Sequence, residues 1–402
     1  MSLQSTPRAE RLHIGLYGTR NSGKSSLINA LTNQHTALVS EVAGTTTDPV
    51  YKSMELFGVG PVVFIDTAGY DDEGELGHQR VGKTKEAARR TDIALLLISE
   101  EAEIAKARVW HGAFRKSKTP VLLIVSQCDK KDDGGRALAE AVERELGEKP
   151  LCVSAETGMG IAAIRRAVLE KLPEDYDAVS LTGDLVQPGD TVLLVMPQDI
   201  QAPKGRLILP QVQTMRDLLD RSCVVLSATT DRLDDALVAL KEPPKLIITD
   251  SQVFKKVYDK KPAQSRLTSF SVLMAHYKGD ISFFAESAKD IDKLPKDAHI
   301  LIAEACTHNP VDGDIGRIQI PAKLRALLGD GITVDVVSGA DFPEDLTPYD
   351  LVVHCGACMF NRRYVLSRAE QAKAQGVPMT NYGILLARLA GILDRIELPG
   401  KS

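Results

Sequence analysis

Cysteine and histidine side chains gather in two short stretches of the C-terminal third of the sequence. One stretch runs from Cys306 to His308, and after a gap of 45 residues the other reads His354-Cys355-Gly356-Ala357-Cys358. Two thiols three positions apart can hold one metal ion or metal cluster, but two ligands rarely complete such a site. We therefore expect Cys306 to supply a third thiolate, and we take His308 and His354 as candidates for a fourth ligand or a supporting contact.

The residues around both stretches predict strands that end at the cysteines. Ala298 to Ala305 is an apolar run before Cys306, and Leu351 to Val353 is another before His354. In open parallel sheets, ligands collect beyond the carboxyl ends of the strands, so distant cysteines can converge there. A helix predicted after Cys358 would direct its positive N-terminus at the site and favour thiolate over thiol.

Four interpretations of these cysteines remain open on residue type and spacing alone. Three thiolates and a non-cysteine fourth position suit a 4Fe-4S cluster with one exchangeable iron, which we rank first. Three cysteines and one histidine suit a structural zinc ion almost as well. A thioredoxin-like pair would leave Cys306 unexplained, and inert thiols are the fourth interpretation. The remaining cysteines, Cys128, Cys152 and Cys223, adjoin apolar runs and are expected to be small buried hydrophobic residues.

A second group of residues, near the N-terminus, is suited to binding phosphate. The apolar run His13 to Tyr17 leads into Gly18-Thr19-Arg20-Asn21-Ser22-Gly23-Lys24-Ser25 and then into a helical pattern. This is G-x-x-x-x-G-K-S in its strand–loop–helix context, where backbone N–H groups converge on phosphate oxygens. We expect Lys24 to reach the β- and γ-phosphates and Ser25 to bind magnesium. The expected nucleotide-contacting residues here are Gly18, Asn21, Ser22, Gly23, Lys24, Ser25 and Ser26.

Two further segments are expected to complete the magnesium and catalytic site. The apolar run Val62 to Ile65 ends in Asp66-Thr67-Ala68-Gly69, which places a carboxylate at a strand tip. The polar loop between these motifs contains Thr46, whose hydroxyl could enter the metal shell when the γ-phosphate is present. We therefore predict Lys24, Thr46, Asp66 and Gly69 as catalytic residues, with Ser25, Thr46 and Asp66 serving magnesium.

The strand predicted from Val121 to Val125 leads into Ser126-Gln127-Cys128-Asp129, which resembles the guanine-binding loop of the GTPase superfamily. In that superfamily the motif is Asn-Lys-x-Asp, and the aspartate pairs with guanine. Asp129 is retained here, whereas Ser126 and Gln127 replace Asn and Lys. Ser154 and Ala155 resemble the last base-facing loop of the same superfamily. A lost buried amide contact costs about 1–3 kcal/mol, so GTP stays favoured over ATP.

Within that superfamily the chain resembles GTPases of the TrmE–Era type. Asn21 matches the loop asparagine that helps to hold a potassium ion in those enzymes. Tyr70 stands where Ras-like enzymes carry a water-orienting glutamine. The resemblance implies slow, potassium-stimulated hydrolysis of GTP.

Length and patterning indicate three domains, since about 100–200 residues form one domain. We predict an α/β fold in which a P-loop GTPase domain at 1–175 precedes two smaller α/β domains with parallel sheets, at 176–268 and 269–402. Strand and helix patterns alternate through 176–268 without catalytic residues, so this domain is expected to form a homodimer. Leu267 to Tyr277 is predicted to be helical and to lead into the last domain.

Composition restricts the functional classes. The 402 residues are 44% apolar and 26% charged, with a net charge of −5, which is ordinary for a soluble globular protein. The charge offers no broad basic surface, and we expect no nucleic-acid partner. Neither a signal peptide nor a run of about 18 apolar residues occurs, so we expect a cytoplasmic protein with no membrane partner.

The combination of a TrmE–Era-like GTPase with Cys306, His308, His354, Cys355 and Cys358 closely resembles the HydF family, the GTPases among the FeFe-hydrogenase maturation factors. This resemblance spans essentially the whole chain. It implies a scaffold that binds GTP, Mg2+, K+ and a 4Fe-4S cluster, accepts a diiron subcluster precursor made with radical-SAM maturases, and delivers it to apo-FeFe-hydrogenase. The alternative is a regulatory TrmE–Era-type GTPase with a structural zinc domain.

Overall fold

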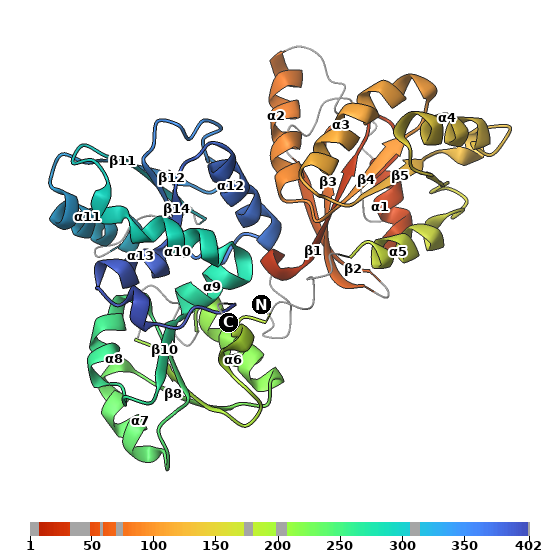
Figure 1. The fold of residues 1–402 in the computed structure, drawn as a ribbon. Helices are drawn as coiled ribbons and strands as arrows, with labels where there is room; N and C mark the ends of the chain where they lie inside the picture. The colour runs from red at the N-terminus through yellow and green to blue at the C-terminus, as the bar shows by residue number, and fades with distance from the viewer. Residues whose placement is uncertain are drawn as a thin grey trace. The chain divides into compact units, whose positions relative to one another are not determined.

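A computed structural model describes residues 8–32, 49–56, 59–69, 75–172, 180–197, 207–305 and 314–400. Thr46, Tyr70, Cys306 and His308 therefore lie outside the described residues. The chain divides into two compact units, Met1–Tyr176 and Asp177–Ser402. Their elements are labelled in Figure 1, and each unit is described separately.

The first unit is built on a six-stranded sheet in the order β2-β3-β1-β4-β5-β6. Only the pairing of β2 with β3 is antiparallel, and the other neighbours are parallel. Every residue of β1, β4 and β5 is buried, as expected for strands covered on both faces. The strands are β1 (Leu12–Tyr17), β2 (Val50–Leu56), β3 (Gly60–Asp66), β4 (Ile93–Ile98), β5 (Val121–Val125) and β6 (Leu151–Cys152).

Helices cover both faces of this sheet. Apolar residues of α1 (Lys24–Thr32) and α5 (Ile161–Glu170) form one core cluster with the strands. Those of α3 (Ile104–Lys116) and α4 (Arg136–Leu146) form a second cluster on the other face. The unit also contains α2 (Glu75–Arg89). Because β1 lies between β3 and β4, the loops that follow β1 and β3 meet at one edge of the sheet.

The second unit contains two four-stranded parallel sheets, ordered β10-β9-β7-β8 and β12-β11-β13-β14. This confirms the expected fold class, a P-loop domain followed by α/β units with parallel sheets. The first sheet comprises β7 (Thr191–Val195), β8 (Val224–Ala228), β9 (Leu246–Thr249) and β10 (Arg266–Ser269). The second comprises β11 (His299–Glu304), β12 (Thr333–Ser338), β13 (Leu351–His354) and β14 (Met379–Asn381).

Helix α9 (Phe270–Lys278) connects the two sheets, because it packs against helices from both regions, including α6, α12 and α13. The first sheet is accompanied by α6 (Leu209–Asp220), α7 (Leu233–Ala239) and α8 (Phe254–Lys260). The second is covered on one face by α11 (Ile320–Leu328) and α13 (Tyr382–Leu389), and on the other by α10 (Ile281–Lys289) and α12 (Arg362–Ala374).

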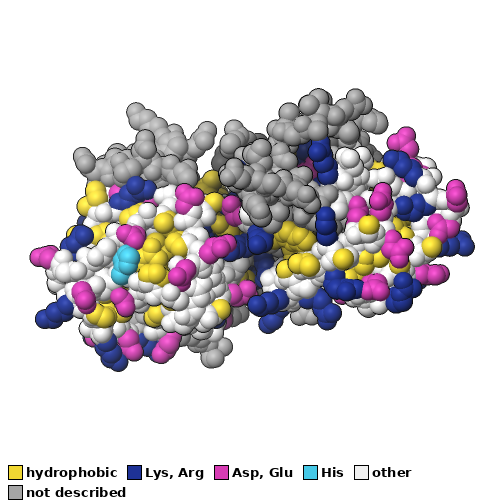
Figure 2. Space-filling model, turned by 90° about the horizontal axis from the view of Figure 1, so that it is seen from above, with side chains coloured by type: hydrophobic (Ala, Val, Ile, Leu, Met, Phe, Trp, Pro, Cys, Tyr) yellow, Lys and Arg dark blue, Asp and Glu magenta, His cyan; other side chains and the backbone are white. Residues whose placement is uncertain are grey.

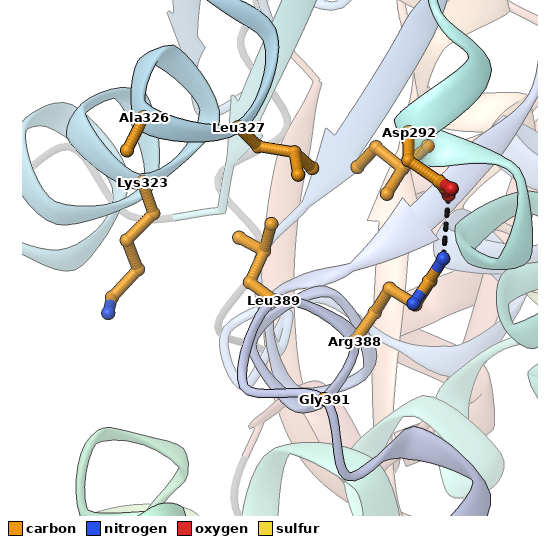
Figure 3. Close-up of a pocket in the computed structure, with 8 residues that line it drawn as sticks. Asp292, Lys323, Ala326, Leu327, Arg388, Leu389 and Gly391 are labelled. Carbon is orange, nitrogen blue, oxygen red and sulfur yellow. Dashed lines mark hydrogen bonds and ion pairs between the residues drawn. The ribbon is translucent and has the colours of Figure 1, made fainter.

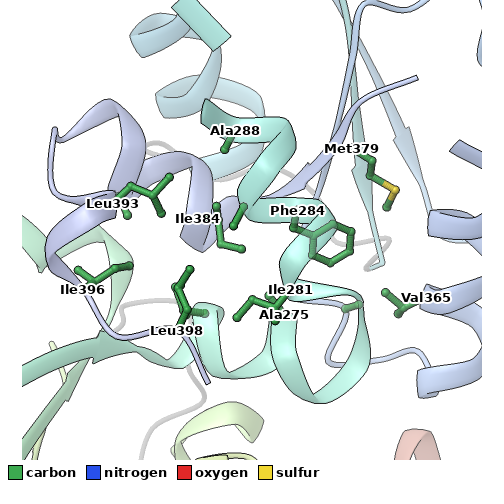
Figure 4. Close-up of a cluster of buried hydrophobic side chains, with 14 of the residues drawn as sticks. Ala275, Ile281, Phe284, Ala288, Val365, Met379, Ile384, Leu393, Ile396 and Leu398 are labelled. Atoms are coloured by element: carbon green, nitrogen blue, oxygen red, sulfur yellow. The ribbon is translucent and has the colours of Figure 1, made fainter. Parts of the chain in front are cut away.

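The two sheets of the second unit share a continuous hydrophobic core. One cluster includes Leu193 of β7, Phe284 of α10 and Met379 of β14, and part of it is drawn in Figure 4. The C-terminal segment also returns to the first sheet, where the Glu397 amide donates to the Leu267 carbonyl at 2.8 Å. The division into three domains stays a prediction.

The predicted helix from Leu267 to Tyr277 is wrong at its start. Leu267 to Ser269 belong to β10, whose Leu267 pairs with Ile247 of β9, and the helix begins at Phe270. The Ser269 side chain accepts a hydrogen bond from the Val272 amide at 3.2 Å and so caps the helix. The domain boundary predicted between 268 and 269 consequently falls inside a paired strand.

The surface view in Figure 2 shows lysine and arginine side chains interspersed with aspartate and glutamate on the face displayed. Across the described residues, no helix combines the length and apolar character needed to cross a bilayer.

Candidate functional site

The loop after β1 has a backbone that depends on its glycines. Gly23 has φ +91° and Asn21 has φ 64°, both in the left-handed region that disfavours most side chains. A Cβ at Gly18 would lie 2.4 Å from the Ser22 hydroxyl oxygen and 2.9 Å from the Leu97 carbonyl oxygen. The loop can therefore approach its neighbours closely only with glycine at position 18.

Lys24, the first residue of α1, is buried within this loop. Its Nζ donates to the carbonyl oxygens of Thr19 at 2.7 Å and Gly18 at 3.1 Å. Phosphate oxygens can replace these carbonyls as acceptors when a nucleotide occupies the loop. The structure thus places the predicted phosphate-binding lysine at the start of the helix, where a phosphate would also meet the positive end of the helix dipole.

The two predicted magnesium residues that are described lie in direct contact. The Ser25 hydroxyl donates to Asp66 Oδ2 at 2.7 Å. Parallel pairing of β1 with β3 sets Leu16 opposite Asp66 and brings the two loops together. Hydroxyl and carboxylate oxygens are the donors that Mg2+ prefers, so the pair fits this ion. Gly69 is buried three residues beyond Asp66, and Thr46 lies outside the described residues.

The base-binding loop is tied to the phosphate loop by the two residues that depart from the Asn-Lys-x-Asp pattern. The Ser126 hydroxyl donates to the Ser22 carbonyl at 2.8 Å, and Gln127 Nε2 donates to the Asn21 carbonyl at 2.6 Å. From the sequence alone, both substitutions indicated only a loss of guanine contacts. The missed indication was that serine and glutamine can still donate hydrogen bonds at these positions.

Asp129 lies exposed next to Ser154, as the guanine-binding prediction requires. A hydrogen bond from the Ser154 hydroxyl is the main cause that lowers the pKa of the Asp129 carboxyl. Ser154 is itself buried and accepts from the Thr157 amide at 3.1 Å, so its position is fixed. An ionised carboxylate can accept from both guanine N–H donors. Ala155 follows Ser154 and is half-buried.

We expect Asp129→Asn to weaken GTP binding by about 10²-fold, because hydrogen bonds to a charged group are worth about 1.5–3 kcal/mol each. The side-chain amide of the introduced asparagine can donate to the 2-oxo group of xanthine, so binding of xanthosine triphosphate should improve. Fluorescence titration with both nucleotides measures the change. Asp132→Asn removes the same charge from an exposed position in the same loop and serves as the control. Unchanged GTP affinity in Asp129→Asn would contradict the assigned role.

The second candidate site is the loop between β13 and α12, which carries Cys355 and Cys358. The Cys355 sulfur accepts hydrogen bonds from the amides of Ala305 at 3.0 Å and Ala357 at 3.4 Å. Ala357 has φ 53°, which turns its amide toward the sulfur side of the loop. Ala305 directly precedes Cys306 in the sequence, so the chain reaches its proposed third cysteine from a residue in contact with Cys355.

These contacts suit an anionic, metal-bound sulfur. Burial raises the pKa of the Cys355 thiol to about 11, and the hydrogen bonds from Ala357 and Ala305 oppose that rise. Hydrogen bonds to sulfur and local burial are the factors by which proteins tune iron–sulfur clusters. Within the described ranges, no group of three His, Cys, Asp or Glu residues could hold a metal ion. Cys306 and His308 lie outside those ranges.

Both ring nitrogens of the buried His354 are engaged in hydrogen bonds. Nε2 lies 2.9 Å from Arg368 Nη1, and Nδ1 lies 2.8 Å from the Cys355 carbonyl oxygen. A guanidinium only donates, so Nε2 accepts and Nδ1–H donates to the carbonyl. Burial and the Arg368 charge lower the pKa of His354 to about 3. In this arrangement the neutral imidazole supports the cysteine loop and has no free lone pair for a metal.

If the 4Fe-4S cluster expected from the sequence binds at this loop, His354→Gln should retain it, with unchanged iron content and electron paramagnetic resonance spectrum. The glutamine carbonyl can still accept from Arg368, whereas His354→Ala leaves that buried guanidinium without this acceptor. The alanine variant should lose about 1–3 kcal/mol of unfolding free energy. Urea unfolding of the metal-free proteins and iron analysis check both statements. If His354→Gln lost the cluster at unchanged stability, ligation by His354 would be supported instead.

A separate cavity of about 470 Å3 lies in the second unit among α11, α13 and the turn at Ile291–Lys293. Figure 3 shows the Arg388–Asp292 ion pair, which joins Nη2 to Oδ1 at 2.6 Å, beside Leu327 and Leu389. Among the described residues that are predicted to bind nucleotide or metal, none lines this cavity. Its lining residues are Ile291, Asp292, Lys323, Ala326, Leu327, Arg388, Leu389 and Gly391.

Comparison with known proteins identifies relatives of the GTPase region. The chain is 34% identical over 166 residues to the tRNA modification GTPase MnmE of Polynucleobacter asymbioticus, covering 39% of this chain and 34% of that protein. It is 33% identical over 167 residues to GTPase Der of Wolinella succinogenes, covering 40% of this chain and 35% of that protein. The chain thus spans about a third of the length of these curated relatives. An Era variant of Aquifex aeolicus bound to GDP.AlF4- has 17% identity and a TM-score of 0.36, with 57% of this chain and 98% of that chain covered.

Three family models match successive parts of the chain. Residues 13–127 match the 50S ribosome-binding GTPase family, which agrees with a GTPase domain in the first unit. Residues 181–279 match the hydrogen maturase F dimerization domain, and residues 282–398 match the hydrogen maturase F tetramerization domain. The last two matches together cover more than half of the sequence. The chain therefore belongs to the hydrogen maturase F family of GTPases.

Proposed function

We propose that this chain is a GTP-hydrolysing scaffold in FeFe-hydrogenase maturation. It binds a 4Fe-4S cluster through Cys306, Cys355 and Cys358, accepts a diiron subcluster precursor from radical-SAM maturases and delivers it to apo-hydrogenase. The observation that carries this proposal concerns the Cys355 sulfur. It accepts hydrogen bonds from two backbone amides where the neighbouring strands β11 and β13 end. Membership of the hydrogen maturase F family supports it.

In the nucleotide site, each described residue has a defined task. Lys24 holds the β- and γ-phosphates, Ser25 and Asp66 hold magnesium, and Asp129 selects guanine. Thr46, which lies outside the described residues, would supply a further hydroxyl oxygen to the magnesium ion when the γ-phosphate is present. Hydrolysis is slow because no glutamine follows Gly69 to orient water. Asn21 would help to hold a potassium ion, and that ion would supply positive charge near the transferred phosphate.

The two chemistries belong to different units of the chain. Phosphate, magnesium and guanine contacts come from the first unit, and the described cysteines of the cluster loop come from the second. In this proposal, GTP hydrolysis in the first unit controls contact with partner proteins. The loop that carries Cys355 and Cys358 in the second unit is where the diiron precursor docks.

Anaerobic purification followed by metal and sulfide analysis tests the proposal. We expect iron and acid-labile sulfide in near-stoichiometric cluster amounts and turnover of GTP that is faster in potassium than in sodium buffer. One zinc per chain without sulfide would favour the alternative, a regulatory GTPase with a structural zinc domain. Equal turnover in the two buffers would remove the potassium assignment at Asn21 and leave the cluster assignment standing.

We also propose that the chain self-associates through the exposed edge of the first sheet of the second unit. Strand β8 lies at this edge, and Val224 at its start is 58% exposed. An unpaired edge strand presents N–H and C=O groups that can pair with another copy. The match of this region to a dimerization domain supports a second copy of the chain as the partner.

We expect Val224→Glu to shift the protein from dimer toward monomer, because it places a charge on this apolar edge. Sedimentation velocity at micromolar concentration measures the distribution. Val109→Glu, at a 72% exposed position of α3 in the GTPase domain, is the matched control and should leave it unchanged. A monomeric unmodified protein under these conditions would overturn the assignment.

A further inference from the structure

Lys278 is a buried lysine that contacts the backbone of the cysteine loop. It is the last residue of α9 and is 1% exposed. Its Nζ donates to the Phe360 carbonyl at 2.6 Å, the Ala357 carbonyl at 3.3 Å and the Cys358 carbonyl at 3.4 Å. Lysine is rarely buried so completely, and carbonyl acceptors offset part of its desolvation cost. The ammonium therefore lies within hydrogen-bonding distance of the residue that carries the second thiol.

The same helix end is fastened to α12 by a second contact. Arg362 Nε, in the first turn of α12, donates to the Tyr277 carbonyl at 3.0 Å. The segment between Cys355 and Arg362 is consequently held at both its middle and its end by α9. Without Lys278, three loop carbonyls lose a common donor, and the loop gains freedom to move the two sulfur atoms apart.

We infer that Lys278 is a positioning residue of the cluster site, which fixes the cysteine loop and stabilises the reduced cluster by its positive charge. This inference rests on the proposed function. Reduction of a 4Fe-4S cluster by one electron adds negative charge, and a buried cation nearby makes that charge more favourable. Removal of the ammonium should therefore make the reduction potential more negative.

Three variants at position 278 separate charge from hydrogen bonding. Lys278→Met removes both, Lys278→Gln retains a neutral donor, and Lys278→Arg retains the charge. Lys289→Met makes the same chemical change on the exposed side of α10, where Lys289 pairs with Glu286, and is the matched control. Each full-length protein is reconstituted anaerobically with iron and sulfide, analysed for both, and titrated with dithionite while paramagnetic resonance follows the one-electron reduction. GTP turnover by the first unit confirms integrity.

We expect Lys278→Met to retain less cluster and to reduce at a more negative potential than the unmodified chain. Lys278→Gln should retain more cluster than the methionine variant at a similarly lowered potential, and Lys278→Arg and Lys289→Met should resemble the unmodified chain. Complete cluster loss from the methionine and glutamine variants, with retention in the arginine variant, would also support the inference.

Two results would overturn it. One is unchanged cluster content and potential in Lys278→Met and Lys278→Gln. The other is equal cluster loss in all three variants together with lower unfolding stability of the metal-free proteins, which would indicate a role in folding alone. Absence of a cluster from the unmodified chain would instead reject the proposed function, so the two failures are distinguishable.

Discussion

We expect Cys355→Ser to abolish binding of the proposed 4Fe-4S cluster while GTP hydrolysis continues at close to the rate of the unmodified chain. The substitution removes the sulfur that accepts hydrogen bonds from the Ala305 and Ala357 amides. A serine hydroxyl is a much poorer ligand for iron than a cysteine thiolate. Two cysteines cannot complete the proposed site alone. The phosphate-binding loop lies in the other compact unit of the chain, so its geometry should be retained.

Iron and sulfide analysis, visible absorption and GTP turnover on one anaerobic preparation measure this separation. Cys223→Ser is the control, because Cys223 is buried beside β8 and its thiol donates to the Gln187 carbonyl at 3.5 Å, a contact that serine can reproduce. That variant should retain both properties. Loss of the cluster and of GTP hydrolysis together in Cys355→Ser would contradict the division of labour between the units.

Lys24→Met should lower GTP turnover by about 10²- to 10³-fold, the usual effect of removing one donor to transition-state charge. The ammonium is buried in the loop between β1 and α1, where it donates to the Gly18 and Thr19 carbonyls, which phosphate oxygens can replace as acceptors. Methionine has a similar length without charge, so the loop should still fold. Cluster content should not change.

Single-turnover hydrolysis and GTP binding distinguish a loss of chemistry from a loss of affinity in this variant. Lys106→Met, on the exposed side of α3, makes the same replacement away from the loop and should hydrolyse GTP normally. Normal turnover in Lys24→Met would reject the assignment of the loop as the phosphate site. Reduced cluster content in this variant would reveal a dependence of the second unit on the first.

Short-range patterns predicted most strands correctly. The apolar run from Val121 to Val125 coincides with β5, and the run from Val62 to Ile65 lies within β3. The motif from Gly18 to Ser25 lies between a strand and a helix as expected. These elements are local, since a buried strand shows itself as an apolar run and a phosphate loop by its glycine spacing.

Contacts between distant residues could not be predicted in the same way. Lys278 ends a helix, where lysine is ordinarily solvated, yet its ammonium binds a carbonyl 82 residues away. Gln127 contacts the Asn21 carbonyl across 106 residues and links the base loop to the phosphate loop. Nothing in either local sequence indicates a partner at such a separation.

The sequence by itself determined the candidate nucleotide-binding and metal-binding residues, the α/β class and the positions of several strands along the chain, because these depend on residue type and short spacing. The tertiary structure decided that His354 gives its nitrogens to Arg368 and a carbonyl, that Leu267 to Ser269 form a strand, and that two sheets share one core. Those outcomes depend on which distant groups become neighbours and on the burial that follows, and burial changes both hydrogen-bond partners and pKa.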